Sequence, residues 1–173
     1  MTWRTQSFTD VEGNKDREFL RFLDLPSRTP TRFGLAVNGP QELLAQHGWS
    51  PKPAMALTRS IETYRAFIQS SKGEFGVAKH AYVSRRSGWF SDRTACYLAA
   101  GRPALVQDTG WTEHLPSDAG LLSFSTPDEA IDNLARLEAD YPTHARSART
   151  IAQDHFDASR ILPALLELSL IHI

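Results

Sequence analysis

The sequence is poor in the residues that several classes of protein require. It has a single cysteine, Cys96, among 173 residues. A disulfide framework or a cysteine-rich zinc site within the chain is therefore excluded, and a reducing cytoplasm is the expected location. No apolar run is long enough to span a membrane, and the polar first residues do not resemble a signal peptide. We expect a cytoplasmic protein without a transmembrane segment.

Neither sign of charge is in excess. Nineteen Lys and Arg against 20 Asp and Glu leave a net charge of -1, which lacks the basic footprint of a nucleic-acid-binding protein. Hydrophobic residues make up 41% and charged residues 23%, so the chain can bury a core and stay soluble. The length is that of one ordinary domain, and no nucleic-acid partner is expected.

Several sequence motifs of catalysis and cofactor binding are also missing. There is no H-E-x-x-H, no P-loop and no G-x-G-x-x-G, and the six histidines are scattered, so no metal site or cofactor is expected. Ser91, Asp108 and His114 could form a hydrolase triad only on paper, because the G-x-S-x-G elbow is absent.

Short apolar segments alternate with amphipathic helical patterns. Strands are predicted at 33–37, 54–57, 75–78, 104–107 and 121–124, and helices at 17–25, 40–48, 61–68, 92–100, 127–141, 142–152 and 158–165. The alternation predicts an α/β fold, a Rossmann-like parallel sheet with helices on both faces. Residues 1–15 lack periodicity and predict an extended or partly disordered lead. In the last helix, Ile161, Leu162 and Leu165 are expected to face inward.

The last six residues, 168–173, read LSLIHI. The codons CTG TCT CTT ATA CAC ATC encode this hexapeptide and look like the transposase end sequence used to build sequencing libraries. We interpret the segment as an adapter-derived tail and Glu167 as the last natural residue. Such a segment is left out of fold reasoning.

The stretch from Ser87 to Arg93, S-G-W-F-S-D-R, should lie at the carboxyl end of the sheet, where ligands bind. Gly88 lets the backbone approach a ligand, and Ser91 can cap the following helix, whose first N–H groups favour an anion. Arg93, one turn inside, adds a positive charge suited to phosphate. On capping alone, a simple capped helix with an exposed arginine explains the pattern better.

Asp108-Thr-Gly110 matches the triplet of aspartic proteases, but it occurs once and follows a parallel-type strand. It is also compatible with a strand-end turn or with a loop facing a ligand. Cys96 is interpreted as a small buried apolar residue. Trp49, Trp89 and Trp111 are interpreted as packing residues rather than stacking platforms, although Trp89 and Trp111 flank the proposed site. Four basic residues could surround an anion or merely form a solvated face: Lys72, Lys79, Arg85 and Arg86.

The order of three motifs resembles one family. S-x-G-E-F-G-V-A-K (71–79), S-G-W-F-S-D-R-x-x-x-Y-L-A-x-G-R-P (87–103) and Q-D-T-G (107–110) look like bacterial GT-B glycosyltransferases (glycosyl transferase group 1-like). The match is to their C-terminal, donor-binding half and covers 15–166. It implies two Rossmann-like domains facing each other across a cleft, with the nucleotide sugar held by the C-terminal one and mainly the acceptor by the other.

The resemblance also implies a domain organisation. Residues 1–16 would be a lead from a missing N-terminal domain, and 17–167 the nucleotide-sugar-binding domain. The enzyme would transfer a sugar from a nucleotide diphosphate sugar to an unknown acceptor without a metal ion. The fragment alone should then be inactive.

Site residues follow from the same resemblance. Arg93 and the backbone of Gly88–Ser91 would approach the donor diphosphate, and Lys15 resembles a lysine that contacts phosphate in relatives. Asp108, Thr109 and Gly110 would face the sugar. The full set of implied donor-binding residues is Lys15, Glu74, Lys79, Gly88, Trp89, Phe90, Ser91, Asp92, Arg93, Asp108, Thr109 and Gly110.

One departure from the family's pattern leaves other functions open. Many relatives carry a glutamate on this helix that holds the donor ribose, and Cys96 stands at that position here. Ribose contact would have to come from elsewhere, from Asp92 or Glu74, or be lacking. The alternatives are a nucleotide-sugar epimerase of GT-B architecture and a non-catalytic ligand-binding or scaffold domain.

Overall fold

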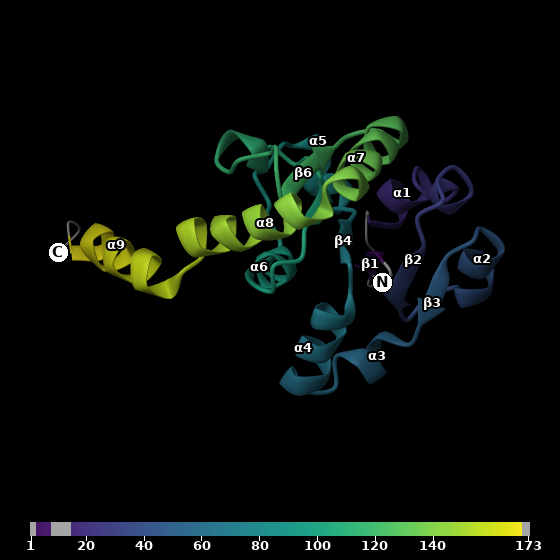
Figure 1. Cartoon of the computed structure of the whole chain (residues 1–173), viewed down its shortest axis with the longest axis horizontal. Coiled ribbons are helices and arrows are strands. Elements are labelled where there is room, and N and C mark those ends of the chain that lie inside the picture. The colour runs from purple at the N-terminus through teal and green to yellow at the C-terminus, as the bar shows by residue number, and fades with distance from the viewer. Residues whose placement is uncertain (1–2, 8–14, 171–173) are drawn as a thin grey trace.

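The structure is a computed structural model that describes residues 3–7 and 15–170. Within these ranges six strands form one sheet in the order β3-β2-β1-β4-β5-β6, with every neighbouring pair parallel (Figure 1). The strands are β1 (Trp3–Ser7), β2 (Phe33–Val37), β3 (Ser50–Lys52), β4 (Gly73–Gly76), β5 (Ala104–Gln107) and β6 (Leu121–Phe124). The predicted fold class is confirmed, and the strand order changes direction between β1 and β4.

Helices connect the strands and cover both faces of the sheet. They are α1 (Lys15–Leu20), α2 (Gln41–Gln46), α3 (Ala54–Leu57), α4 (Ile61–Ser70), α5 (His80–Ser84), α6 (Asp92–Ala99), α7 (Pro127–Ala139), α8 (Tyr141–His155) and α9 (Ala158–Leu170). Two 3-10 turns, Leu25–Ser27 and Trp111–Glu113, complete the described elements.

Local signals explain where several helices begin and end. Ser60 caps α4 by accepting a hydrogen bond from the Thr63 N–H at 3.2 Å, and Thr126 caps α7 by accepting one from the Glu129 N–H at 3.2 Å. Pro127 fills the first position of α7, where a missing N–H costs nothing. Gly101 follows α6 with φ +65°, as a helix-ending glycine should.

Each face of the sheet has its own core. On one face an aromatic cluster joins the turn after α1 to the strands: Phe22 contacts Phe124 with ring centroids 5.0 Å apart, and Phe75 stacks on Phe124 at 5.0 Å. On the other face Leu98 of α6 packs with Val106 of β5 and with α8. Because side chains alternate along a strand, Phe75 enters the first core while Glu74 faces α6.

The N-terminal segment differs from the prediction. The segment was predicted to be an extended or partly disordered lead outside the sheet, but Trp3–Ser7 forms β1 in the middle of the sheet, pairing with β2 over five residue pairs and with β4 over two. Its sequence, WRTQS, is too polar to resemble a central parallel strand, which usually reads as an apolar run. Residues 8–14 lie outside the described ranges.

Two short elements were also wrongly predicted. Residues 54–57 form helix α3, and the strand beside β2 is β3 at Ser50–Lys52. A run of four apolar residues cannot be distinguished from one helical turn by periodicity. Helix α5 lies between the strand predicted at 75–78 and the helix predicted at 92–100, where no element was predicted.

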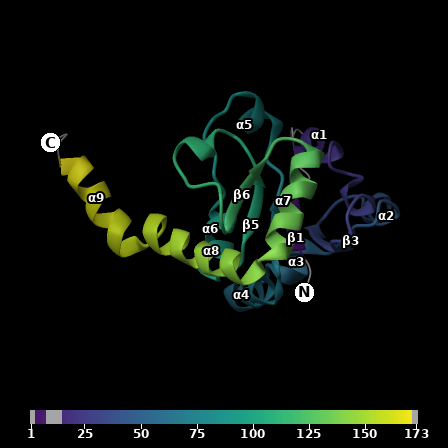
Figure 2. The same cartoon turned by 45° about the horizontal axis from the view of Figure 1, so that its top comes forward.

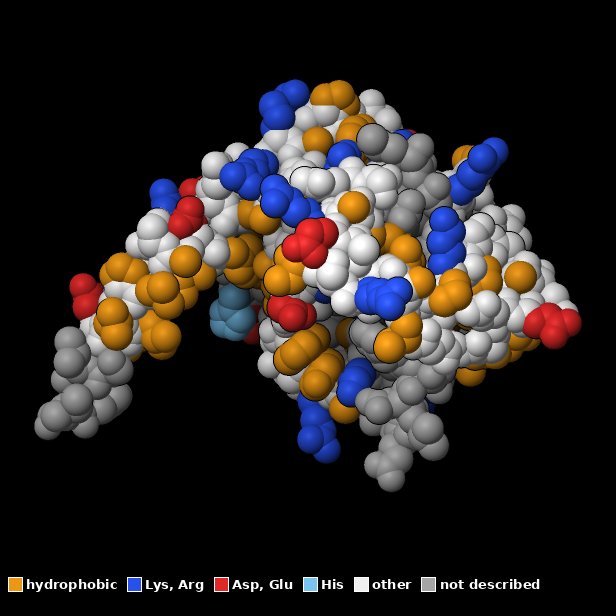
Figure 3. All heavy atoms as spheres, turned by 90° about the horizontal axis from the view of Figure 1, so that it is seen from below, with side chains coloured by type: hydrophobic (Ala, Val, Ile, Leu, Met, Phe, Trp, Pro, Cys, Tyr) orange, Lys and Arg blue, Asp and Glu red, His pale blue; other side chains and the backbone are white. Residues whose placement is uncertain are grey.

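Helix α9 points away from the sheet, and its apolar side chains gather along one side (Figures 2 and 3). Ile161, Leu162 and Leu165 are 42%, 54% and 58% exposed, so the prediction that they face inward was wrong. Helical spacing indicates which residues share a face but not whether that face has a partner. The helical backbone continues to Leu170, and the origin of the 168–173 segment stays a prediction.

Candidate functional site

A cleft of about 740 Å³ opens at the carboxyl ends of β4 and β5. Its lining includes Ile61 and Tyr64 from the start of α4 and the residues from Trp89 to Thr94. Gly76 at the end of β4 and Val106 of β5 also line it. This is the edge at which parallel α/β sheets bind ligands, and it was the position predicted for the Ser87–Arg93 stretch.

The first turn of α6 forms part of the cleft. Ser91 occupies the N-cap position, as predicted, but its hydroxyl accepts no capping hydrogen bond. The carboxylate of Asp92 is the side-chain acceptor at this helix start instead. Its Oδ1 accepts a hydrogen bond from the Arg93 N–H at 2.8 Å and one from the Ser91 hydroxyl at 3.4 Å. Both Ser91 and Asp92 line the cleft.

Arg93 lies against the strand beneath α6 rather than extending into solvent. Its Nε donates to Oε1 of Glu74 at 2.6 Å, and its side chain is 14% exposed. Burial acts to lower the pKa of Arg93, but the charge of Glu74 and this hydrogen bond raise it above its ordinary value. The guanidinium is therefore a fixed positive group at the edge of the cleft, not the exposed arginine of a simple capped helix.

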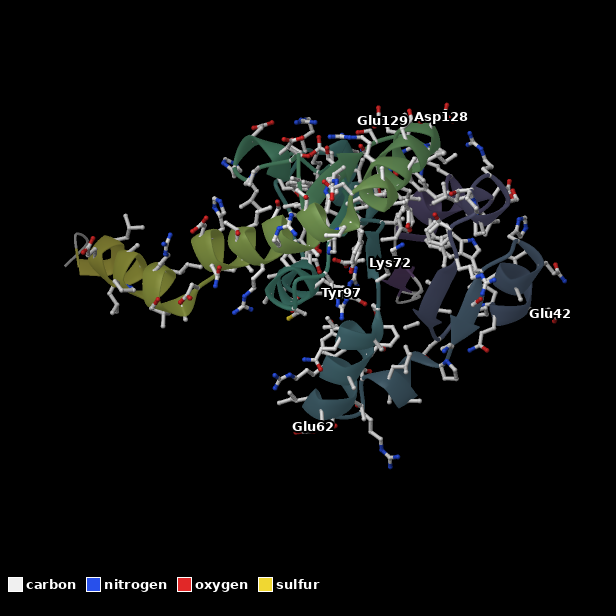
Figure 4. All side chains as sticks on the ribbon, viewed as in Figure 1. Glu42, Glu62, Lys72, Tyr97, Asp128 and Glu129 are labelled. Carbon is white, nitrogen blue, oxygen red and sulfur yellow. The ribbon has the colours of Figure 1, made fainter. Side chains whose placement is uncertain are left out.

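Glu74 itself has no exposed surface, so it reaches the cleft only through Arg93. Its Oε2 has no hydrogen-bond partner among the described residues. Two tyrosines lie around this ion pair: burial raises the pKa of Tyr64 to about 12 and also raises that of Tyr97. Figure 4 labels Tyr97, which belongs to α6, on the side of that helix toward α4. A direct ribose contact by Glu74 is excluded by its burial.

Two hydrogen bonds connect the loop at Gly88–Trp89 to Thr109, just after the end of β5. The Gly88 N–H donates to the Thr109 carbonyl at 2.8 Å, and the Thr109 hydroxyl donates to the Trp89 carbonyl at 2.6 Å. Phe90 turns inward and packs on Trp111, with ring centroids 5.7 Å apart. Trp111 is 1% exposed, so it is the packing residue that was predicted.

Asp108 is used within the strand-end turn. Its Oδ1 accepts from the Gly110 N–H at 2.8 Å and from the Thr112 hydroxyl at 3.2 Å, while Oδ2 lies 3.3 Å from Nη1 of Arg86. Gly110 has φ +95°, and a Cβ there would lie 3.0 Å from the Arg86 carbonyl oxygen. Of the predicted triplet only Thr109 lines the cleft.

The basic residues do not gather around one point. Lys79 lines the cleft, whereas Lys72 pairs with Glu138 at the start of β4 (Figure 4) and Arg86 pairs with Asp108 and Glu113. The side chain of Lys15, the first residue of α1, lies outside what the structure describes, so its phosphate role stays a prediction.

Sequence reasoning missed a buried carboxylate beside the cleft, Glu18 of α1, which is 2% exposed. It accepts hydrogen bonds from His80 Nδ1, Gln107 Nε2 and Arg21 Nη1 at 2.6, 2.6 and 2.7 Å. Burial acts to raise the pKa of Glu18, but these three donors lower it below its ordinary value. The signal available in the sequence was its position four residues before Phe22, on the apolar stripe of the helix predicted at 17–25.

Gln107 extends this network to the cleft. Its Oε1 accepts from the Ala78 N–H at 3.0 Å, so its amide links Glu18 of α1 to the end of β4. Gln107 and Ala78 both line the cleft. The network holds the backbone that follows β4 in place, and its buried polar groups are satisfied, as a stable network requires.

Cys96 also lines the cleft and is exposed, so its interpretation as a buried apolar residue was wrong. It lies one turn after Asp92 on the same side of α6. Partial burial of the sulfur raises the pKa of Cys96, and the negative charges of Asp92 and Glu74 add to this effect.

We expect Cys96 to be alkylated slowly despite its exposure. Because its pKa is raised, the thiolate fraction at pH 8 is below the value of about a quarter for an ordinary thiol of pKa 8.5. The measurement is the rate of iodoacetamide labelling against pH, with the unfolded chain as reference. Asp92→Asn removes one negative charge and should speed labelling. A folded protein labelled as fast as the unfolded chain would contradict the expectation.

No three His, Cys, Asp or Glu side chains between residues 15 and 170 gather as metal ligands. Among the described helices, none combines the length and apolarity needed to cross a bilayer.

Two of the solved structures that are similar to this one are those of the GtfA/B complex and of TarM. The crystal structure of the GtfA/B complex matches 96% of the chain at 9% identity and a TM-score of 0.56, and that of TarM matches 97% at 12% identity and a TM-score of 0.64. The chain spans 35% and 36% of those chains. No protein-family model matches the sequence, and neither does a curated protein.

Both of these structures are glycosyltransferases. At such low identities the likeness shows the fold alone. The domain is a Rossmann-like half of a GT-B architecture, as the sequence motifs predicted.

Proposed function

We propose that the cleft binds the nucleotide diphosphate sugar of a glycosyltransferase and that this chain is the donor-binding half of that enzyme. One observation carries the proposal: Arg93 is held by Glu74 at the first turn of α6, in a cleft at the carboxyl end of the sheet. A fixed guanidinium and the first N–H groups of a helix suit a diphosphate. The fold shared with glycosyltransferases supports the same function.

The chemistry of sugar transfer explains why such a group is useful. The leaving group is a nucleoside diphosphate, whose negative charge grows as the bond to the sugar breaks. A positive group that is already in place stabilises this charge without reorganising during the reaction. We propose that Arg93 supplies this stabilisation without a metal ion.

The test is calorimetric titration of the protein with UDP, GDP and dTDP, with and without EDTA. Arg93→Lys keeps a positive charge beside Glu74 but loses the planar group that binds two phosphate oxygens, so binding should weaken roughly tenfold. Arg65→Lys, on the exposed outer side of α4, is the matched control and should bind as the wild type does. The proposal would be contradicted if none of the three nucleotides binds, or if Arg93→Lys and the wild type bind with equal affinity.

We further propose that the acceptor site and any catalytic base belong to a second α/β domain of a longer cytoplasmic enzyme. The chain spans about a third of the solved chains it matches, which supports this division. The 173-residue chain would then bind a donor without transferring or hydrolysing the sugar, and release of the sugar from a labelled donor would contradict it.

A further inference from the structure

Trp89 is an aromatic side chain held in place at the cleft with much of its surface uncovered. It lines the cleft and is 47% exposed. Trp49 and Trp111 are 2% and 1% exposed, and their indole N–H groups donate to backbone carbonyls. The indole N–H of Trp89 has no acceptor among the described residues. Trp89 is therefore unlike these two packing tryptophans.

The position of Trp89 is fixed from two directions. Its ring stacks on Tyr82 of α5, with centroids 4.8 Å apart and an interplanar angle of 18°. Its carbonyl accepts from the buried Thr109 hydroxyl at 2.6 Å, and the Ser87 N–H donates to the Tyr82 carbonyl at 3.2 Å. A rigid ring loses little conformational entropy when a ligand binds.

The rest of the cleft suits a ligand with a ring next to a charged group. Arg93 follows Trp89 by four residues, across the loop that begins α6, and both side chains line the same cleft. Ile61, at the start of α4, also lines the cleft and is 82% exposed. A ligand with its diphosphate at Arg93 would therefore meet two exposed apolar side chains, Trp89 and Ile61, in the same cleft.

We propose that Trp89, backed by Tyr82, is a stacking platform for a flat ring of the bound nucleotide sugar. Two rings of that molecule share this chemistry: the nucleobase presents a π face, and the sugar presents an apolar C–H face. The inference rests on the proposed function, since it needs the diphosphate to be held at Arg93. In this proposal Trp89 is the residue that discriminates among ligands that carry the same diphosphate but different rings.

The experiment compares Trp89→Leu with Trp89→Phe. Leucine keeps an apolar side chain but not the ring, so binding of the recognised ligand should weaken roughly tenfold. Phenylalanine keeps a ring, so its affinity should stay within roughly threefold of wild type. Circular dichroism checks that both variants fold, which the exposure of Trp89 favours.

The ligands identify the ring. If Trp89→Leu weakens UDP and UDP-glucose equally, the platform binds the base; if it weakens only UDP-glucose, it binds the sugar. Inorganic pyrophosphate has no ring and should bind all three proteins alike. Wild-type binding should also quench tryptophan fluorescence, and this quenching should be largely lost in Trp89→Phe.

Two different failures can be told apart. If UDP and UDP-glucose bind wild type and Trp89→Leu with the same affinity, the platform is disproved while the donor cleft stands. If neither nucleotide nor pyrophosphate binds the wild-type protein, the donor cleft itself is disproved, and the platform with it.

Discussion

Replacing Gly120 by alanine is expected to lower the free energy of unfolding by roughly 4 kcal/mol, since backbone strain and a steric clash act together. Gly120 has φ +82°, and a Cβ there would lie 2.3 Å from the Ala148 nitrogen and 2.7 Å from the Ser147 carbonyl carbon. Both atoms belong to the backbone of α8, which cannot move aside as a flexible side chain can. Urea unfolding followed by circular dichroism measures the change.

Gly101→Ala is the matched control. Gly101 also has positive φ, +65°, but the nearest atom to a Cβ, the Ala145 carbonyl oxygen, is 3.6 Å away. Only the backbone strain remains, which costs about 1 kcal/mol. A Gly120→Ala protein as stable as Gly101→Ala would mean that α8 does not approach β6 as closely as described.

The second large effect concerns the ion pair beneath α6. Glu74→Gln should lower the free energy of unfolding by about 3 kcal/mol, because it leaves the Arg93 charge largely buried without a carboxylate. Glu113→Gln makes the same chemical change in an exposed pair with Arg86, whose side chains are 62% and 56% exposed. That control should cost less than about 1 kcal/mol.

A double variant separates loss of the pair from general disruption. Glu74→Leu with Arg93→Met removes both charges, and such replacements of buried ion pairs are often neutral or stabilising. We expect urea unfolding to show the double variant to be more stable than Glu74→Gln. A double variant that is the less stable of the two would mean that packing at this position, not charge pairing, determines stability.

Much of the fold was predictable because its signals are local. Thr126 and Pro127 mark the start of α7, Gly101 marks the end of α6, and the apolar segment 104–107 is β5, all within a few residues of their predicted positions. β1 was missed because its place in the sheet is decided by pairing with Phe33–Val37, about thirty residues later in the chain. No property of WRTQS alone reveals this pairing.

The candidate site was predictable in part for the same reason. The loop and first turn that bring Ser91 and Arg93 to the cleft are contiguous in sequence, and the capping pattern located them. The partner of Arg93 is Glu74, nineteen residues earlier on a neighbouring strand. Finding it requires knowing which face of β4 meets α6, and that depends on packing between distant elements.

The aromatic cluster on one face of the sheet has a consequence for synthesis of the chain. A ribosome releases β1, β2 and β3 first, and these three strands are consecutive in the sheet, with β2 in the middle. They cannot complete their core alone, because Phe22 packs on Phe124 and Phe33 on Phe75. The half of the sheet made first therefore leaves the ribosome with uncovered aromatic rings, and the cluster is complete only after residue 124 has emerged.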